Sequence, residues 1–400
     1  MEIAVIADDL TGAADTGVQL VRAGYRAAVV FRGESLPKDL DAVAVDTDSR
    51  TKPAGLASKR VVEAGKAVRH ARIVYKKLDS TLRGSVAAEL SAALGATRRD
   101  RVVVAPAFPA AGRTTMNGVQ LVHGVPVHET EMRNDPRTPV KEAHVPTLLR
   151  EVFSSVATLG VEDLAHGERV SQALKDNECV VVDAERNTDL ETLVRAVPDP
   201  SSVLWAGSAG LALALGVVYP GSRQSDSSAP EAPARRVLVV IGSLSGVARE
   251  QLGRLSEEYG EVAVSVRGGG SGAVTDAGDA ARRALAESGC AVLHSPEKRG
   301  KSRGAGSFVR ALANVVEVLA GDDAFDALVL TGGSTAMGVA RRLGASGIKL
   351  VGEVEAGVPV GALIGPRPYR VVTKAGGFGG PDTLLHAVRT LTQNEEENSQ

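Results

Sequence analysis

The fold assignment begins from one stretch near the start of the chain, Ile3-Ala4-Val5-Ile6-Ala7-Asp8-Asp9-Leu10-Thr11-Gly12-Ala13-Ala14-Asp15. The apolar run from Ile3 to Ala7 predicts a buried strand, and a helical pattern follows Gly12. Two carboxylates, Asp8 and Asp9, stand between the strand and the helix. Open α/β sheets bind their ligands at the carboxyl ends of the strands. The stretch therefore predicts a strand–helix unit with a ligand site at its turn.

The two aspartates also have a structural explanation, because an aspartate before a helical run commonly caps the helix. One aspartate is enough for a cap, whereas here two stand in a row and Asp15 follows one turn later. Thr11 and Gly12 suit a tight turn into a helix whose free N–H groups can hold an anion. We therefore expect at least one of Asp8 and Asp9 to act in binding or catalysis.

The length and composition are those of a globular protein with more than one domain. A chain of 400 residues is too long for one ordinary core. The net charge of −2 and the 3% of aromatic residues argue against a nucleic-acid partner. No signal peptide or apolar span of membrane length occurs, so we expect a cytoplasmic protein without a membrane partner. Cys179 and Cys290 lack zinc-type spacing and are expected to be buried strand thiols.

Short apolar runs alternate with helical patterns along the first half of the chain, which predicts a parallel sheet. The predicted strands are Ile3–Ala7, Ala27–Phe31, Ala42–Val45, Ile73–Lys77, Val102–Ala105, Cys179–Asp183 and Val203–Ala206. The predicted helices are Pro53–His70, Glu168–Lys175 and Asp189–Val197, with two more that begin near Ser85 and Leu211. Residues 111–146 break this pattern. We expect them to form an irregular functional excursion with one short strand, Gly124–His128, and buried Val125 and Val127.

A run rich in Pro, Ser and Ala without periodicity, residues 220–234, predicts a linker. It separates a first domain, residues 1–219, from a second, residues 235–400. The second domain repeats the α/β pattern, with predicted strands at Val237–Ile241, Val262–Val266, Ala291–His294, Ala327–Leu330 and Tyr369–Thr373. We therefore predict two α/β domains, each with a mostly parallel sheet flanked by helices.

Three strands of the second domain end in turns of small polar residues. These turns are Gly242-Ser243-Leu244-Ser245, Thr331-Gly332-Gly333-Ser334-Thr335-Ala336 and Lys374-Ala375-Gly376-Gly377-Phe378-Gly379-Gly380. Glycine lets the backbone approach a phosphate closely, and helix N-termini supply positive potential. Together they indicate a site for a nucleotide polyphosphate, although tight turns alone would also explain the glycines. No Walker motif and no complete dinucleotide fingerprint is present, and we interpret Gly268–Gly272 as a linker between a strand and a helix.

The first domain places charged and hydroxyl side chains at its strand ends. They are Asp8, Asp9, Arg50, Lys76, Lys77, Asp79, Ser80 and Arg83. Arginine, lysine and serine suit a small carboxylate, and aspartate suits a sugar-like hydroxyl, as acceptor or base. A surface ion-pair network is the alternative explanation for some of these residues. The pattern indicates a small hydroxy acid as ligand.

These motifs resemble those of the four-carbon acid sugar kinase family, once known as a domain of unknown function. The resemblance covers nearly the whole chain and rests on Ile6–Gly17, Asp46–Arg50, Lys76–Gly84, Ala105–Pro109, Gly242–Ser243, Thr331–Ala336 and Lys374–Gly379. One motif differs: the family's last loop usually reads closer to Ser-Gly-Asn-Phe-Gly, whereas here it is Ala375-Gly376-Gly377-Phe378-Gly379. Contacts of this loop with a nucleotide would then be made through backbone N–H groups.

The resemblance implies ATP-dependent phosphorylation, with Mg²⁺, of the terminal hydroxyl of threonate, erythronate or 3-oxo-tetronate. It implies that residues 1–219 bind the acid, that residues 235–400 bind ATP, and that the active site lies in the cleft between the domains. The implied acid-binding residues are Asp9, Arg50, Lys76, Lys77, Asp79, Ser80, Thr81, Leu82 and Arg83. The implied nucleotide-binding residues are Ser243, Gly332, Gly333, Ser334, Gly376, Gly377, Phe378 and Gly379. No protein ligand of a metal is assigned.

Several points stay open at the level of the sequence. The catalytic base for in-line phosphoryl transfer is Asp9, Asp8 or Asp382, the last because it would lie beside the γ-phosphate. An acidic first-turn or capping role is the alternative for Asp382. A sugar-acid binding protein or sensor, or a dehydrogenase acting on the same acids, are the rival functions. The oligomeric state is also open, and a homodimer is the arrangement that we consider.

Overall fold

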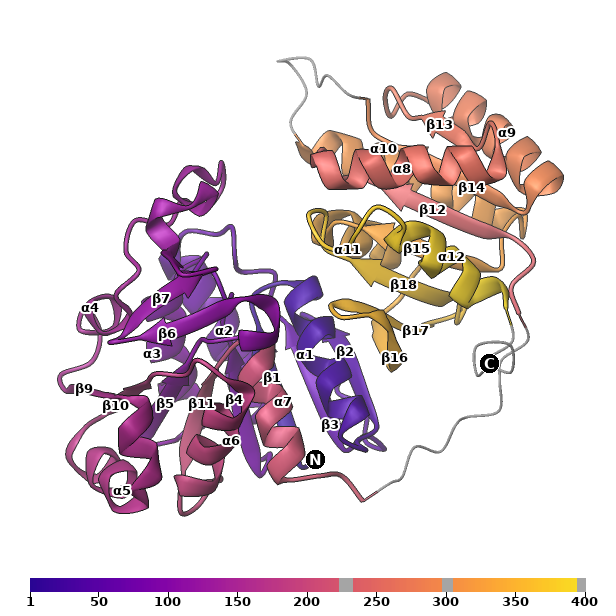
Figure 1. Cartoon of the computed structure of the whole chain (residues 1–400). Coiled ribbons are helices and arrows are strands. Elements are labelled where there is room, and N and C mark those ends of the chain that lie inside the picture. Colours follow the sequence, from indigo (N-terminus) through magenta and orange to yellow (C-terminus); the bar gives the residue numbers. More distant parts are fainter. Residues whose placement is uncertain (223–232, 297–304, 394–400) are drawn as a thin grey trace. The chain divides into compact units, whose positions relative to one another are not determined.

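The computed structural model describes residues 1–222, 233–296 and 305–393 and divides into two compact units, Met1–Ser225 and Asp226–Gln400. Most of the predicted linker, residues 220–234, falls outside the described residues. Each unit has a mostly parallel sheet flanked by helices (Figure 1), which confirms the predicted fold class.

The sheet of unit 1 is parallel throughout, with the strand order β2-β3-β1-β4-β11-β5-β10-β9. Its strands are β1 (Ile3–Ala7), β2 (Ala27–Phe31), β3 (Ala42–Asp46), β4 (Ile73–Lys77), β5 (Arg101–Ala105), β9 (Val156–Leu159), β10 (Cys179–Val182) and β11 (Val203–Gly207). Its α-helices are α1 (Leu10–Arg22), α2 (Ala54–Val68), α3 (Val86–Thr97), α4 (Val145–Leu149), α5 (Gly167–Asp176), α6 (Asn187–Ala196) and α7 (Ala209–Val218).

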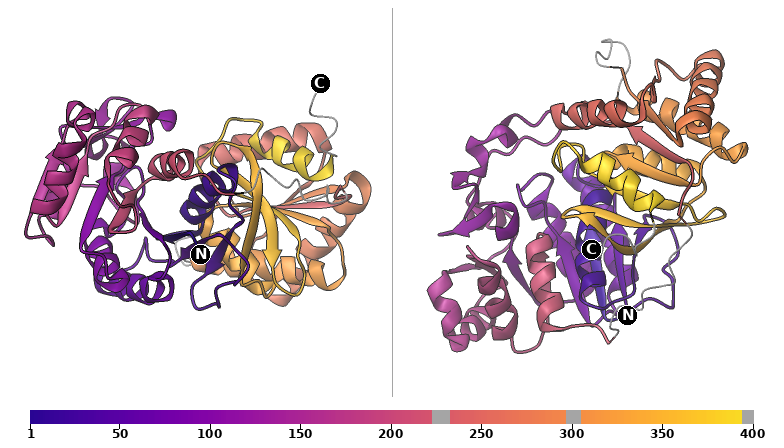
Figure 2. Two further views of the ribbon diagram at one scale, coloured as in Figure 1. Left: turned by 90° about the horizontal axis from the view of Figure 1, so that it is seen from below. Right: turned by 45° about the vertical axis from the view of Figure 1, so that its right-hand side comes forward.

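The buried central strands of unit 1 fix which loops meet. Every residue of β1 is buried, as its unbroken apolar run predicts for a strand covered on both faces. Helix α2 packs against α3, while α7 packs against α1 and α6 (Figures 1 and 2). Ala7 lies opposite Asp46 of β3, and Ile6 lies opposite Lys76 of β4. The residues that follow β1, β3 and β4 therefore meet at one edge of the sheet.

The prediction for residues 111–146 is wrong in part. Instead of one strand at Gly124–His128, a separate three-stranded antiparallel sheet forms from β6 (Arg113–Met116), β7 (Val119–Val122) and β8 (Val125–Pro126). Val127 is buried, but Val125 is exposed. Asn117 and Gly118 both have positive φ between β6 and β7, as a tight hairpin turn of the Asn-Gly type requires. Single 3₁₀ turns are η1 (Pro109–Ala111), η2 (Val127–Glu129), η3 (Glu131–Asn134) and, further along, η4 (Val161–Ala165).

Unit 2 has a parallel sheet in the order β13-β14-β12-β15-β18, extended by antiparallel β17 and β16. Its strands are β12 (Val237–Ile241), β13 (Ala263–Ser265), β14 (Cys290–His294), β15 (Ala327–Thr331), β16 (Gly347–Glu355), β17 (Val358–Ile364) and β18 (Arg370–Lys374). Its helices are α8 (Gly246–Tyr259), α9 (Ser271–Ser288), α10 (Ala305–Gly321), α11 (Gly333–Arg342) and α12 (Thr383–Thr392). Helix α8 packs against α12, and α10 packs against α9 and α11 (Figures 1 and 2).

The location of the two cysteines and the apolar character of the helices can be read from these elements. Cys179 and Cys290 are free, buried and located on strands, as predicted. Within the ranges that the structure describes, no helix combines the length and the apolar character that a membrane span requires.

Candidate active site

Arg50 is the centre of a charged cluster at the carboxyl edge of the unit 1 sheet. Its Nε and Nη2 atoms donate to the two oxygens of Asp8, each at 2.8 Å. Its Nη1 atom donates to Oδ2 of Asp9 at 2.6 Å and lies 3.3 Å from Oδ2 of Asp79. The cluster is largely enclosed, because the side chain of Arg50 is 14% exposed and that of Asp8 only 5%. One guanidinium therefore holds together three carboxylates from two separate strand ends.

The surrounding charges keep two of these carboxylates ionised. Burial alone would raise the pKa of Asp8, but Arg50 and the two lysines that end β4 hold that pKa below its usual value. Burial also opposes ionisation of Asp79, but the charges of Arg50 and Arg83 hold its pKa well below the usual range. A carboxylate with a low pKa accepts hydrogen bonds well but takes up a proton poorly. Asp8 and Asp79 are thus suited to holding cations and hydroxyl groups.

Asp9 has the capping role that the sequence left open. It is the N-cap of α1, accepting a hydrogen bond from the N–H of Gly12 at 2.8 Å and one from the hydroxyl of Thr11 at 2.9 Å. Its side chain is nevertheless 23% exposed, compared with 5% for Asp8. Asp9 is therefore the carboxylate of this pair that a ligand can reach more easily.

The two adjacent lysines of β4 have different surroundings, because successive side chains of a strand point to opposite faces. Nζ of Lys76 forms a buried ion pair with Glu89 of α3 at 2.9 Å. Nζ of Lys77 donates to the carbonyl of Leu78 at 2.9 Å, and a Cβ atom placed on Gly12 would lie 3.4 Å from it. No carboxylate pairs with Lys77 among the residues described for unit 1. Lys77 rather than Lys76 thus offers its charge beside the first turn of α1.

The turn after β4 is held by Asp79. Its Oδ1 accepts from the backbone N–H and the hydroxyl of Thr81, at 2.8 and 2.7 Å, and its Oδ2 pairs with Arg83 at 2.7 Å. Leu82 has a φ of 58°, and its side chain is buried in the core, so the backbone is what Leu82 can offer to a ligand. Ser80 contributes a carbonyl that accepts from the side chain of Gln120 at 2.8 Å.

In unit 2 the sheet register brings the three glycine-containing loops to one edge. Thr331 at the end of β15 lies opposite both Ile241 of β12 and Lys374 of β18. The loops then contact each other directly. The hydroxyl of Ser245 donates to the carbonyl of Gly376 at 2.6 Å, and the N–H of Gly332 donates to the carbonyl of Lys374 at 2.7 Å. The predicted nucleotide residues therefore form one continuous surface on unit 2.

Helix α11 begins within this surface. Its N-cap is Gly332, whose φ of 98° favours glycine and which has no side chain to cap the helix. Gly333 is the first helical residue and Ser334 the second. The uncapped N-terminus of a helix attracts anions, because its first N–H groups lack intrahelical partners. The loop after β15 is thus suited to a phosphate group.

Asp382 and Phe378 have different surroundings from the rest of the predicted residues of unit 2. Asp382 precedes α12 and forms an exposed ion pair with Arg254 at 2.9 Å. Phe378 is 38% exposed and lies over Gly357, where an added Cβ atom would come within 2.9 Å of its ring. Nothing lies within 4 Å of the place where a Cβ atom of Gly377 would be. The loop from Gly376 to Gly379 therefore presents mostly backbone at its open side.

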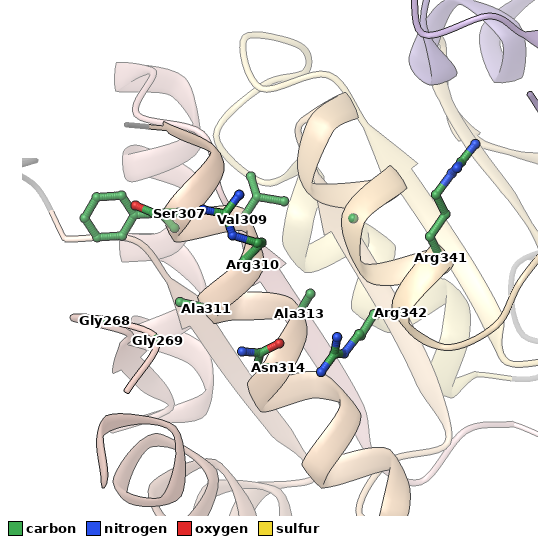
Figure 3. Close-up of a pocket in the computed structure, with 12 residues that line it drawn as sticks. Gly268, Gly269, Ser307, Val309, Arg310, Ala311, Ala313, Asn314, Arg341 and Arg342 are labelled. Carbon is green, nitrogen blue, oxygen red and sulfur yellow. The ribbon is translucent and has the colours of Figure 1, made fainter. Parts of the chain in front are cut away.

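Unit 2 also contains a cavity of about 730 Å³ between α10, α11 and the residues that precede α9 (Figure 3). Its lining includes Arg310 and Asn314 of α10 and Arg341 and Arg342 of α11. Gly268 and Gly269, at the start of the predicted linker Gly268–Gly272, also line it. None of the predicted nucleotide residues lines the cavity, so the cavity is separate from the surface that the three glycine-containing loops form.

Comparison with known proteins shows to which family the chain belongs. Models of a sugar-binding N-terminal domain and of a nucleotide-binding C-terminal domain match residues 3–215 and 238–384. The chain is 36% identical to the D-threonate kinase of Bordetella bronchiseptica over 408 residues, which cover 98% of each chain. The chain belongs to the four-carbon acid sugar kinase family. It is therefore an enzyme of the kinase class, which confirms the resemblance that its motifs predict.

One further curated relative and two solved structures extend the comparison. The D-erythronate kinase of Heliobacterium modesticaldum is 30% identical, with 97% of each chain covered. A Salmonella typhimurium structure described as a putative tRNA synthase has the same fold, with a TM-score of 0.82 at 23% identity, covering 98% of this chain and 99% of that one. A Bordetella bronchiseptica structure, 34% identical with a TM-score of 0.51 and coverage of 98% and 99%, is a domain-swapped dimer with bound citrate.

The kinase has a further carboxyl group beside Asp8 and Asp9 that the sequence did not single out. Asp46 ends β3, is 1% exposed, and accepts a hydrogen bond from the N–H of Asp48 at 2.8 Å. Burial, together with the charges of the neighbouring aspartates, raises its pKa to about 8 despite this hydrogen bond. Its position at the end of a predicted strand was visible in the sequence, but its burial was not.

Replacing Asp46 with asparagine tests this protonation. The folded protein keeps the Asp46 proton up to about pH 8, whereas the unfolded chain releases it near the ordinary aspartate value of 3.8. The stability that this proton gives is therefore present at low pH and lost as pH rises through about 8. The free energy of unfolding of the wild type should fall, relative to Asp46→Asn, by up to about 1.4 kcal/mol per pH unit between about pH 4 and 8.

The measurement is urea unfolding of both proteins at several pH values in that window. Asp100→Asn is the matched control, because Asp100 is an exposed aspartate that directly precedes β5, away from the carboxyl edge where Asp46 lies. Parallel pH dependence of the wild type and Asp46→Asn would show that Asp46 is ionised in the folded kinase.

Proposed function

We propose that this kinase transfers the γ-phosphoryl group of ATP to the terminal hydroxyl of a four-carbon sugar acid, with D-threonate as the preferred acceptor. The observation that carries the proposal is that one chain has both halves of the required chemistry. Unit 1 gathers Lys77 with the Arg50 cluster at one strand edge, and unit 2 gathers three glycine-containing loops at another. The extent of similarity to a D-threonate kinase supports the choice of acid.

The acid would bind through cations and hydroxyl acceptors that the cluster leaves available. Lys77 is the cation best suited to the carboxylate of the acid, because no carboxylate of the described residues pairs with it. Arg50 is engaged by Asp8, Asp9 and Asp79, so its main part is to hold these groups in place. The backbone of Ser80 to Leu82 and the side chains of Thr81 and Arg83 complete the proposed acid site.

The nucleotide would bind through its phosphates. Ser243, the N-terminus of α11 at Gly332, Gly333 and Ser334, and the loop from Gly376 to Gly379 are the proposed contacts. No cluster of three or more potential metal ligands occurs among His, Cys, Asp and Glu in the described ranges. Mg²⁺ would thus be held mainly by the phosphates and water, where it neutralises charge on the transferred group. In-line transfer requires the hydroxyl to meet the γ-phosphate, and a cleft between the domains stays a prediction.

Asp9 is the proposed acceptor of the hydroxyl proton, since it is more exposed than Asp8 and the pKa of Asp8 is lowered. Asp9→Asn should lower kcat by about 10²–10⁴-fold, the usual contribution of a general base. It should leave the N-cap bond to Gly12 in place, because asparagine keeps an acceptor oxygen. Asp382→Asn should change kcat little. The measurement is steady-state kinetics of both variants, and a collapse of kcat in Asp382→Asn alone would reverse the assignment.

A coupled ADP-release assay tests the function. The enzyme is given ATP and Mg²⁺ with the D and L forms of threonate and erythronate and with their 3-oxo forms. We expect the highest kcat/KM for D-threonate. A higher value for another acid of the panel would contradict the assigned substrate, and no ADP release with any of them would contradict the acceptor class. Reduction of added NAD⁺ would instead favour the dehydrogenase alternative.

We also propose a homodimer, which the domain-swapped dimer of the Bordetella bronchiseptica structure supports. Light scattering on the purified full chain tests it. A mass of twice 41.3 kDa is expected, and the mass of a single chain would contradict the proposal.

A further inference from the structure

Lys374, the last residue of β18, lies directly beneath the loop that follows it. Its side chain is buried, with 1% of the residue exposed. Its Nζ atom donates to three backbone carbonyls of the loop, those of Ala375 at 3.0 Å, Gly376 at 3.5 Å and Phe378 at 3.0 Å. An ammonium group has three donors, so these three carbonyls occupy all of them. Lys374 therefore binds the loop rather than a ligand above it.

Two other side chains bind the same carbonyl groups. The hydroxyl of Ser245 donates to the carbonyl of Gly376, and the side-chain amide of Gln251 donates to the carbonyls of Phe378 and Gly380, at 3.2 and 2.7 Å. Gln251 is fully buried on α8. The loop is thus fixed with its carbonyls turned into the protein.

The orientation of the carbonyls determines that of the N–H groups. In a planar trans peptide, the N–H of the next residue points away from the carbonyl. The carbonyls of Ala375, Gly376 and Phe378 belong to the same peptide groups as the N–H groups of Gly376, Gly377 and Gly379. These three N–H groups therefore point away from Lys374. Across the described part of the chain, no acceptor is found for these three N–H groups. Backbone N–H groups without an acceptor in the protein can bind an anion such as a phosphate.

We propose that Lys374 is a positioning residue for the nucleotide phosphates, because it holds the loop after β18 in the conformation that turns these free N–H groups away from the protein interior. The inference rests on the proposed function, since it assumes that the loop binds phosphate. It explains how a loop that reads Ala375-Gly376-Gly377-Phe378-Gly379 binds phosphate without the serine and asparagine side chains usual in the family. The backbone supplies the donors, and the buried ammonium supplies order and positive charge beneath them.

The charge of Lys374 depends on pH near neutrality. Burial lowers its pKa to about 8, against the opposing charge of Glu355 at the end of β16. Glu355 itself accepts from the hydroxyl of Thr383 and lies 3.8 Å from His386, both on α12. Loss of the proton removes the positive charge and one donor, so binding of phosphate by the loop should weaken above about pH 8. Stability should change in the opposite sense, because a lysine in the unfolded chain keeps its proton up to its ordinary pKa of 10.5.

The experiment compares ADP with AMP as calorimetric probes of the full-length enzyme, since the ratio of their affinities reports the terminal phosphate. Lys374→Met keeps an unbranched side chain only one atom shorter and removes its donors. Lys349→Met, an exposed lysine of β16, is the matched control. We expect Lys374→Met to lower the preference for ADP by about tenfold or more, as loss of a charged hydrogen bond predicts. Gln251→Leu should lower it less, and the control should keep it.

The wild type provides a second measurement that does not depend on the folding of a variant. Its preference for ADP should fall between about pH 7 and about pH 9.5, while its melting temperature does not fall in parallel. An unchanged preference in Lys374→Met, or a wild-type preference that is independent of pH, would overturn the role of Lys374. A wild type that binds ADP no better than AMP would overturn the proposed phosphate site, and this inference with it.

Discussion

Arg50→Met is expected to lower kcat/KM for the acid sharply and to destabilise unit 1. The substitution leaves Asp8, Asp9 and Asp79 facing each other without the cation that they share. Removing one partner of a buried ion pair typically costs about 3–5 kcal/mol, because an uncompensated charge stays buried. KM for the acid should rise far more than KM for ATP, because the charges that lose their cation belong to the acid site.

The measurements are urea unfolding and steady-state kinetics with each substrate varied in turn. Arg26→Met is the matched control, because Arg26 pairs with Asp41 at the surface of the same unit, where ion pairs contribute little. Lowering the pH should restore part of the stability of Arg50→Met by protonating the unpaired carboxylates. A variant with normal stability and an unchanged KM for the acid would remove Arg50 from the centre of the site.

Gly376→Val is expected to weaken ATP binding by roughly 10–100-fold, the range expected for overpacking a close contact. A Cβ atom on Gly376 would lie 2.7 Å from Cβ of Ser243 and closer still to its hydroxyl oxygen. The valine side chain must therefore push apart two of the three loops that are proposed to hold the phosphates. Binding of the acid should not change, because the altered residues belong to unit 2.

Calorimetric titration with ATP measures this effect. Gly253→Val is the matched control, since nothing lies within 4 Å of a Cβ atom at that exposed position of α8. Adding Ser243→Gly to Gly376→Val should recover part of the affinity by removing the clash. Normal ATP affinity in Gly376→Val would show that these loops do not bind the nucleotide.

The parallel strands could be predicted because short apolar runs that alternate with helical patterns, such as Ile3–Ala7 and Val237–Ile241, are typical of strands covered on both faces. The convergence of Asp8 and Lys77 followed from the same prediction, since the carboxyl ends of parallel strands meet at one edge. The sequence does not show which of these charged side chains form ion pairs with each other at that edge. The sequence indicates Arg50 as a ligand for an acid, whereas in the structure it is first the shared cation of three aspartates.

Most of the strands that were missed are antiparallel and lie outside the repeated strand–helix pattern, whereas β9 at the edge of the unit 1 sheet is a missed parallel strand. Asn117-Gly118 between β6 and β7 is a recognisable hairpin signal, but the short polar strands around it have no buried apolar run. In β16, buried Ile348 and Leu350 alternate with exposed Lys349 and Val351, which is the period-2 pattern of a strand. Buried polar residues such as Gln120 and Lys374 are identified only by their partners in three dimensions.

The structure of the reaction product tests the central claim most directly. The enzyme is incubated with ATP, Mg²⁺ and D-threonate, and the product is examined by ³¹P NMR with coupling to protons. We predict a phosphomonoester whose phosphorus couples to the two protons of the terminal carbon, formed in equal amount to ADP. Inorganic phosphate alone, or a phosphate attached to an inner carbon of the acid, would contradict phosphoryl transfer to the terminal hydroxyl.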